Sequence, residues 1–447
     1  MKKLMYLLLV ATLLSGLVAI GTACGPTPTP GPTATPKVVE KIVVITPTPA
    51  PKRVTLIITG PSSGETGYKV LQKQLERFTK ENPNIEVKIQ EMPWSSTLQH
   101  DMFATWSAGQ LPTPDILRLD IVWPAEFAAA GWVISLDDYI KKAGIDMKDF
   151  LEGPLSGCTY QGKVVCLPYF TDAGLLYYRK DLLEKHGFKP PETFADLKEQ
   201  ALAITKKEGI KNGFVWQGDA YEGGTCDLME YLWGNGADVL DDKGNVVIDN
   251  PKAVEALSVM VDYIKSGVSP AGVTTYKEED ARNVFQRGDA VFMRNWPYAW
   301  AAMNAPDSPV KGKVGAKPMV HGPGQKSAAT LGGWNLAVNK FSQNPDEAFK
   351  LVAFLTSAEI QKGTALGAGL SPTRKSLYKD ADVLAANPFW KDFFDIMIGA
   401  KPRPVHPRYP EISSVLFTEA HKALTGEQDA ATAIKNMAKK ITDIVKK

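Results

Sequence analysis

The chain has 447 residues and a formal net charge of +2, and 44% of its residues are hydrophobic. Lys2 and Lys3 account for that excess charge, so the rest of the chain is formally neutral and has no general electrostatic reason to bind nucleic acid. A chain of this length and apolar content can build two domains or one large one.

Residues 1–23 predict a signal for export. Met1-Lys2-Lys3 is a short positive region, and an apolar run follows from Leu4 to Ile20. The run spans about 17 residues, the short limit for a membrane span, and ends in small residues directly before Cys24. This junction resembles a bacterial lipobox, with Gly21 where the pattern prefers Leu, and the resemblance implies that Cys24 is lipidated. An uncleaved anchor helix and an ordinary signal peptide are the alternatives.

Residues 24–52 read as a tether behind the lipidated cysteine. Pro and Thr recur in GPTPTPGPTATP and again in TPTPAPK, which favours extended polyproline II and interrupts any long helix or sheet. The β-branched run from Val38 to Ile45 fits either a disordered linker or a short strand. We therefore expect an exported protein, periplasmic or extracellular, that is held at the outer face of the cell membrane by lipid alone.

The body begins with strands and helices in alternation. Strands are predicted at 53–59, 85–90 and 115–119, with one helix from about Glu65 to Pro83 and a second at 97–108. Alternation of this kind indicates an α/β fold in which helices pack on the faces of a parallel sheet.

Three further cysteines follow Cys24. Cys158 and Cys166 flank a segment with a plausible turn at Gln161-Gly162, which would bring the two thiols together across a hairpin. In an exported protein this arrangement predicts a disulfide, and two separately buried thiols are the alternative. Cys226 is expected to be unpaired and buried.

Later segments favour helices. They are predicted at 193–207, 251–265, 345–356, 359–366 and 430–446. The first begins with Thr193 and Asp196 in a capping-box-like pattern. The second opens at Asn250-Pro251, and its expected core-facing stripe is Val254, Leu257, Val261 and Ile264.

Motifs for metal or cofactor chemistry are absent from the sequence. The five histidines are far apart and form no HxxH or HExxH pattern, so no metal site is predicted. There is also no P-loop, no GxSxG and no dinucleotide fingerprint, so we expect no cofactor and no catalytic residues. Glycosidases have no short signature, so an exported hydrolase using a pair such as Glu65 and Asp172 is the rival from the enzyme class.

Aromatic residues stand beside Gly, Pro, Asn and acids in five loop-like stretches. They are DIVWP at 120–124, YFTDAG at 169–174, VWQGDAYEGG at 215–224, RNWPYAW at 294–300 and LGGWN at 331–335. A pyranose can stack its C–H face on an aromatic ring, while carboxylates accept its hydroxyls and Arg or backbone N–H groups donate to them. The combination predicts a sugar pocket, although any one tryptophan fits a core position as well.

These stretches resemble the family-1 extracellular solute-binding proteins of ABC sugar importers, and especially their trehalose/maltose-binding subgroup. The most specific segments are DAGLLYYRKDLLEKHG at 172–187, FVWQGDAYEGG at 214–224, RNWPYAWAAMNAPDSPVKGKVG at 294–315 and KSAATLGGW at 326–334. The resemblance implies a type II periplasmic-binding-protein-like fold of two lobes joined by a hinge. The expected N-lobe comprises 53–168 and 312–368, and the expected C-lobe 169–311 and 369–447.

The resemblance also implies a function. We expect a monomeric binding protein, not an enzyme, that closes around an α-linked disaccharide and delivers it to the transmembrane subunits of an ABC permease. Another oligosaccharide or a polyol bound by the same fold is the alternative.

The family's sugar-binding residues carry over onto named positions. The expected hydroxyl acceptors are Glu65, Asp120 and Asp172. The expected stacking groups and donors are Trp296, Tyr298, Gly333, Trp334 and Arg403, and Tyr221 and Glu222 are expected to line the cleft.

Two positions depart from the relatives. Phe170 stands where an aromatic hydroxyl is common, and Trp94 stands where polar and basic residues occur. Both are expected to bear on sugar preference, because a site built to pair a hydroxyl discriminates strongly against ligands that lack it.

Overall fold

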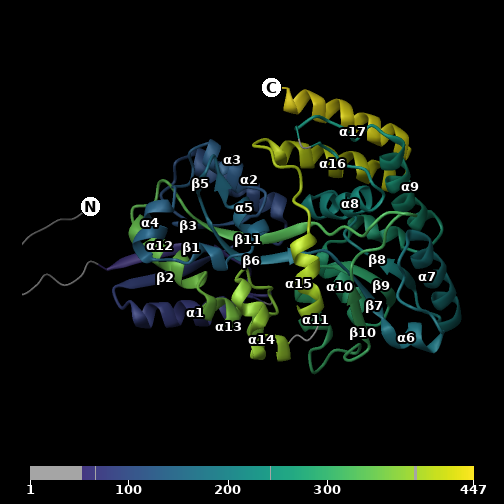
Figure 1. Ribbon diagram of the computed structural model, residues 1–447, viewed down its shortest axis with the longest axis horizontal. Helices are drawn as coiled ribbons and strands as arrows, with labels where there is room; N and C mark the ends of the chain where they lie inside the picture. Colours follow the sequence, from purple (N-terminus) through teal and green to yellow (C-terminus); the bar gives the residue numbers. More distant parts are fainter. Residues whose placement is uncertain (1–52, 66, 242, 387–389, 447) are drawn as a thin grey trace, which may run out of the picture. The chain divides into compact units, whose positions relative to one another are not determined.

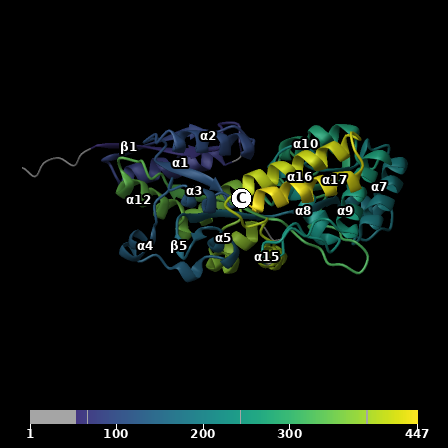
Figure 2. The ribbon, with the colours of Figure 1, turned by 90° about the horizontal axis from the view of Figure 1, so that it is seen from above.

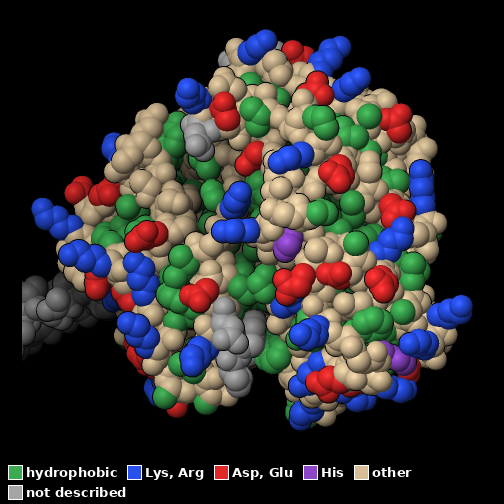
Figure 3. All heavy atoms as spheres, turned by 45° about the vertical axis from the view of Figure 1, so that its right-hand side comes forward, with side chains coloured by type: hydrophobic (Ala, Val, Ile, Leu, Met, Phe, Trp, Pro, Cys, Tyr) green, Lys and Arg blue, Asp and Glu red, His purple; other side chains and the backbone are tan. Residues whose placement is uncertain are grey.

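The computed structural model describes residues 53–446, apart from 66, 242 and 387–389 and the side chain of 392. The predicted signal, Cys24 and the tether lie outside the described residues. Within the described part, no helix combines the length and apolar character that a membrane crossing needs. Acidic and basic side chains are mixed over the face drawn in Figure 3, in keeping with the small formal charge.

The first of the two main sheets has the strand order β2-β1-β3-β11-β6. Strand β1 pairs in parallel with β2 and β3, whereas β11 runs antiparallel to β3 and β6. The strands are β1 Val54–Gly60, β2 Ile85–Glu91, β3 Ile116–Asp120, β6 Leu167–Ala173 and β11 Leu331–Val338. The predicted β-α-β-α-β start is confirmed, since each parallel pair is joined through a helix.

Helices and a 3-10 turn pack around this sheet (Figure 1). In α1, the predicted positions Leu71, Leu75 and Phe78 are buried against the sheet. The elements are α1 Tyr68–Glu81, α2 Ser96–Ala108, α3 Pro124–Ala129, α4 Asp137–Ala143, η1 Met147–Asp149, α5 Glu152–Gly157, α12 Pro345–Leu355 and α13 Ala358–Ala368.

The second sheet has the order β10-β7-β9-β8. Strand β8 is parallel to β9, and β7 is antiparallel to both β9 and β10. The strands are β7 Leu175–Arg179, β8 Asn212–Val215, β9 Ala290–Asn295 and β10 Val314–Lys317. Both ribbon views separate this half from the first, which is the two-lobe architecture expected (Figures 1 and 2).

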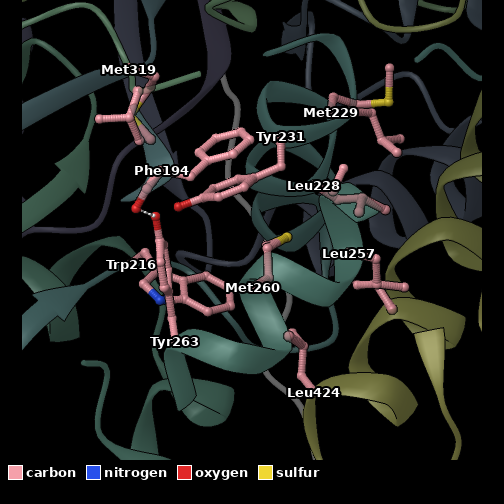
Figure 4. Packing of buried hydrophobic residues seen from close by; sticks show 14 of the residues in the cluster. Phe194, Trp216, Leu228, Met229, Tyr231, Leu257, Met260, Tyr263, Met319 and Leu424 are labelled. Carbon is pink, nitrogen blue, oxygen red and sulfur yellow. Dashed lines mark hydrogen bonds between the residues drawn. The ribbon is translucent and has the colours of Figure 1, made fainter. Parts of the chain in front are cut away.

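A large hydrophobic cluster fills the second lobe (Figure 4). In it, the rings of Phe194 and Tyr231 stack 5.0 Å apart, and Tyr263 Oη donates to the Phe194 carbonyl at 2.8 Å. The helical elements of this lobe are α6 Lys180–Lys185, α7 Phe194–Glu208, α8 Glu222–Gly234, α9 Pro251–Lys265, η2 Ala271–Thr275, α10 Glu278–Gln286, α11 Tyr298–Met303, α16 Tyr409–Leu424 and α17 Ala430–Val445. The remaining elements, η3 Lys375–Lys379, α14 Ala381–Ala386 and α15 Trp390–Gly399, pack near α13 and β6.

Local signals predicted the helix starts well, and the predicted stripe of α9 lies along the edge of its buried face. Thr193 and Asp196 form the predicted capping box, and Asn250 caps α9. The buried residues of α9 are Ala253, Ala256, Leu257, Met260 and Tyr263. Of the predicted stripe, Leu257 is fully buried, and Val254, Val261 and Ile264 are partly buried against the same hydrophobic cluster. Helices α8, α16 and α17 pack on α9.

The strand pairing also moves two predicted lobe boundaries. Residues 169–173 belong to β6 of the first sheet, although the C-lobe was expected to begin at 169. Residues 314–317 form β10, which pairs with β7 of the second sheet, although the N-lobe was expected to resume at 312. The rest of the lobe division stays a prediction.

The predicted hairpin is present as β4 Thr159–Tyr160 and β5 Lys163–Val164. Gln161 and Gly162 both have positive φ, 46° and 76°, as a two-residue type I′ turn requires. Cys158 and Cys166 are buried, unbonded thiols with their sulfur atoms 2.7 Å apart, so the disulfide stays a prediction. Cys226 is buried and unpaired, as expected.

The chain crosses from the first sheet to the second at Gly174, between β6 and β7. A buried ion cluster lies against it: Arg294 of β9 binds Glu230 of α8 at 2.6 and 2.9 Å and Asp227 of α8 at 2.8 Å. A Cβ atom on Gly174 would lie 1.8 Å from Glu230 Oε1 and 2.5 Å from Arg294 Nη2. The position therefore accepts only glycine.

We predict that Gly174→Ala lowers the free energy of unfolding by about 3–5 kcal/mol, because the added methyl group would break a buried ion pair. Urea unfolding measures this. The matched control is Gly363→Ala in α13, where the nearest heavy atom would be 3.9 Å away and where alanine favours the helix. Equal stabilities for the two variants would contradict the prediction.

Candidate functional site

A cavity of about 1080 Å³, including the open space at its mouth, is lined by residues from both lobes. All twelve residues that the sequence suggested for sugar binding line it: Glu65, Trp94, Asp120, Phe170, Asp172, Tyr221, Glu222, Trp296, Tyr298, Gly333, Trp334 and Arg403. Their contact with a sugar stays a prediction.

The aromatic walls of the cavity are held by their neighbours. The ring of Trp296, directly after β9, lies 4.0 Å from the guanidinium carbon of Arg294. Trp334 of β11 packs on Arg118 at 4.5 Å and edge-on against Trp123 at 5.5 Å. Rings fixed in this way are rigid platforms on which a sugar face can stack.

Asp172 is the clearest vacant acceptor in the cavity. Its side chain is on β6 and the residue is 8% exposed. Its Oδ1 atom has no hydrogen-bond partner among the described residues. Burial, and then the charge of Asp120, raise the pKa of Asp172 to about 7, although Arg294 opposes the shift. A buried acceptor of this kind is suited to a ligand hydroxyl.

A charged bridge connects the two lobes beside the cavity. Arg403 Nη2 donates to Asp120 Oδ1 at 2.9 Å, and Arg403 Nη1 donates to Glu222 Oε1. Asp120 ends β3 of the first sheet, and Glu222 begins α8 of the second lobe. Burial raises the pKa of Glu222, and Arg403 opposes that rise. Arg403 was expected to donate to the ligand, and in the structure it pairs with two carboxylates.

Two predicted residues make contacts that the sequence did not indicate. Glu65 Oε1 accepts from the backbone N and Oγ of Ser62 at 2.7 and 2.9 Å, and so closes the turn after β1. Trp94 Nε1 donates across the cavity to Glu278 Oε2 at 3.0 Å. Both side chains therefore make hydrogen bonds within the protein and also line the cavity.

Gly333 and Phe170 form a close backbone contact at the cavity wall. Gly333 has φ 126°, and a Cβ atom there would lie 2.5 Å from the carbonyl oxygen of Phe170. Glycine is therefore required at this position. Phe170 itself is 7% exposed and packs edge-on against Tyr169.

Sequence reasoning missed several cavity residues. Arg118 is buried in the middle of β3, its Nε has no partner in the described part of the chain, and burial lowers its pKa. The sequence could have indicated Arg118, because a charged residue inside an apolar strand is unusual. Glu278 gave no such indication, because acids are common at helix starts. The other missed lining residues are Pro61, Gly67, Ser96, Gln99, Tyr169, Gly223, Cys226, Gly332 and Leu370. The described residues contain no group of three His, Cys, Asp or Glu side chains placed to hold a metal ion.

Comparison with known proteins identifies the family. The bacterial extracellular solute-binding protein family matches residues 61–362. This chain belongs to that family. A probable ABC transporter-binding protein of Deinococcus radiodurans is 38% identical over 393 residues, which cover 86% of this chain and 92% of the relative. The protein is thus an exported solute-binding component of an ABC importer and not an enzyme.

Solved structures of similar proteins agree with this family and fold. Maltose-bound MalE3 of T. maritima is 49% identical, with a TM-score of 0.84, over 88% of this chain and all of that one. The GacH receptor of Streptomyces glaucescens, solved with acarbose, is 27% identical, with a TM-score of 0.79, over 88% of this solute-binding protein and 99% of the receptor. The two-lobe fold of this solute-binding protein is therefore shared with sugar receptors.

We predict a pH dependence of stability that depends on Asp172. The folded protein keeps a proton on this group up to about pH 7, whereas the unfolded chain releases it near pH 4. The folded state is therefore favoured most at low pH, and this contribution is lost as pH rises through 7. Asp172→Asn removes the titration, so the unfolding free energy of the wild type relative to this variant should fall by roughly 2–3 kcal/mol between pH 5 and 8. Urea titrations at each pH measure both unfolding free energies. If those of the wild type and of Asp172→Asn changed with pH in parallel, the prediction would be wrong.

Proposed function

We propose that the protein captures an α-linked disaccharide, of maltose or trehalose type, in the cavity between its lobes and delivers it to its permease. The observation that carries this proposal is the composition of the cavity. Rigid aromatic rings, buried carboxylates and glycine backbone from both lobes line the same space. Stacking surface beside hydroxyl acceptors is the chemistry that recognises a pyranose.

The similarity to relatives supports the same ligand class. MalE3 of T. maritima, at 49% identity, was solved with maltose bound. A protein of Pyrococcus abyssi called a maltotriose-binding protein is 25% identical over 319 residues. We assign maltose as a leading candidate on this ground, trehalose beside it because the sequence resembles the trehalose/maltose-binding subgroup, and another oligosaccharide or a polyol as the alternative.

Capture proceeds by hinge closure, as in periplasmic binding proteins. Sugar binds first to one lobe of an open form, and the other lobe then completes the hydrogen bonds. The sugar shifts the population toward the closed form because it contacts both lobes only there. The permease then recognises the closed form.

We predict that isothermal calorimetry detects maltose or trehalose binding and that Trp296→Ala weakens it about 10- to 100-fold. Loss of a stacking ring costs about 1–3 kcal/mol in comparable base–aromatic contacts. The titration panel also contains sucrose, palatinose, maltodextrins, mannitol and ribitol, which test the alternatives. Trp132→Ala is the matched control, because this ring packs on Phe127 away from the cavity. If calorimetry detected no binding of any compound in the panel, the proposal would be wrong.

We also propose that lipid on Cys24 anchors the mature protein at the outer face of the membrane. Each buried CH₂ of an acyl chain contributes about 0.8 kcal/mol to membrane binding, and stable anchoring needs two chains. We predict that the wild type incorporates labelled palmitate and sediments with membranes, whereas Cys24→Ser takes up no label and stays soluble. Wild-type protein in the soluble fraction would contradict lipid anchoring.

A further inference from the structure

Three hydrogen-bond donors converge on the buried carboxylate of Glu278, the first residue of α10. Trp94 Nε1 and Tyr221 Oη donate to Oε2 at 3.0 and 2.7 Å, and Trp296 Nε1 donates to Oε1 at 3.3 Å. Trp94 comes from the loop between β2 and α2 of the first lobe, whereas the other two belong to the second lobe. One carboxylate therefore connects aromatic side chains on both sides of the cavity.

The charge of Glu278 has no cation beside it. Within the described residues, no Lys or Arg nitrogen lies within ion-pair distance of its carboxylate: Lys277 pairs with Asp219, Arg282 with Glu279, and Arg294 with Asp227 and Glu230. The residue is only 8% exposed. Buried carboxylates in structural roles are paired or fully hydrogen-bonded, since an uncompensated buried charge is costly.

The two oxygens of Glu278 are unequally used. A carboxylate has about four lone-pair sites. Oε2 accepts two short bonds, whereas Oε1 accepts only the longer one from Trp296. Oε1 thus has acceptor capacity left on the side of the stacking ring, and Glu278 lines the cavity. A sugar ring stacked on Trp296 would bring hydroxyl donors to this oxygen.

We propose that Glu278 is a further sugar-contacting and specificity-determining residue, which accepts a hydroxyl of the ring stacked on Trp296 while Trp94 reaches the same carboxylate from the opposite lobe. This inference rests on the proposed sugar-binding function. It goes beyond that function because it assigns discrimination between sugars to one carboxylate and links that carboxylate to closure.

The test combines Glu278→Gln with a series of singly deoxygenated maltose analogues. An indole can only donate, so the E278Q side chain would keep its amide oxygen toward Trp94 and Tyr221 and turn its NH₂ group toward the sugar, where it would also lose the longer bond from Trp296 Nε1. We expect E278Q to weaken maltose binding about 10- to 100-fold, as expected for loss of a charged hydrogen bond. One deoxy analogue should lose a similar factor with the wild type and little with E278Q.

If thermal unfolding shows that E278Q is poorly folded, two further variants still test the proposal. Glu278→Asp keeps the charge but shortens the reach, and should also erase the penalty for that one analogue. Trp94→Phe keeps the ring but removes the inter-lobe donor, and should weaken all sugars by a similar factor of about 3 to 10. Glu184→Gln, at an exposed position of α6, is the matched control and should bind each sugar as the wild type does.

The outcomes separate the two proposals. A wild type that binds no sugar overturns both. A wild type that binds maltose, with E278Q and E278D showing the same relative affinities across the deoxy series, overturns the role of Glu278 alone.

Discussion

The ion cluster of Arg294 with Asp227 and Glu230 holds together the part of the molecule on which the site depends. Burial disfavours the charge of Arg294, but the two carboxylates together raise its pKa above its ordinary value. Glu230 also accepts the backbone N–H of Thr330, just before the chain returns to the first sheet in β11. The cluster therefore joins two of the crossings between the lobes, at Gly174 and Thr330, and its guanidinium supports the ring of Trp296. Removing one partner from such a cluster leaves an uncompensated buried charge.

Patterns that depend on neighbouring residues predicted the fold well, whereas features that depend on distant residues were predicted less completely. The opening alternation, the Thr193 capping box and the Gln161-Gly162 turn each follow from a few adjacent residues. The stripe on α9 does face the core, but α8, α16 and α17, far away in the sequence, bury the residues beside it more completely. The boundary near 312 failed for a similar reason, since β10 belongs to the second sheet only through its pairing with β7.

The candidate site was predicted largely by family resemblance. Aromatic residues beside acids suggested a sugar, but no spacing rule indicates that Asp120, Glu222 and Arg403 meet. Their meeting depends on strand β3, helix α8 and a late loop lying together. Glu278 gave no signal at all, because Lys277-Glu-Glu-Asp280 is also what a helix start favours on electrostatic grounds. Its place in the site is evident from the cavity that it lines and from the three donors that reach it.

The bridges from Trp94 to Glu278 and from Asp120 through Arg403 to Glu222 are made between protein groups of opposite lobes. They contribute the same free energy to the closed complex of every sugar. Such contacts slow the escape of any captured molecule, because most differences in affinity arise in the dissociation rate. A substitution of Trp94 or Arg403 would therefore change the retention of every sugar alike, whereas a substitution of Glu278, which takes part in one bridge and contacts the sugar in our proposal, would change retention and selectivity together.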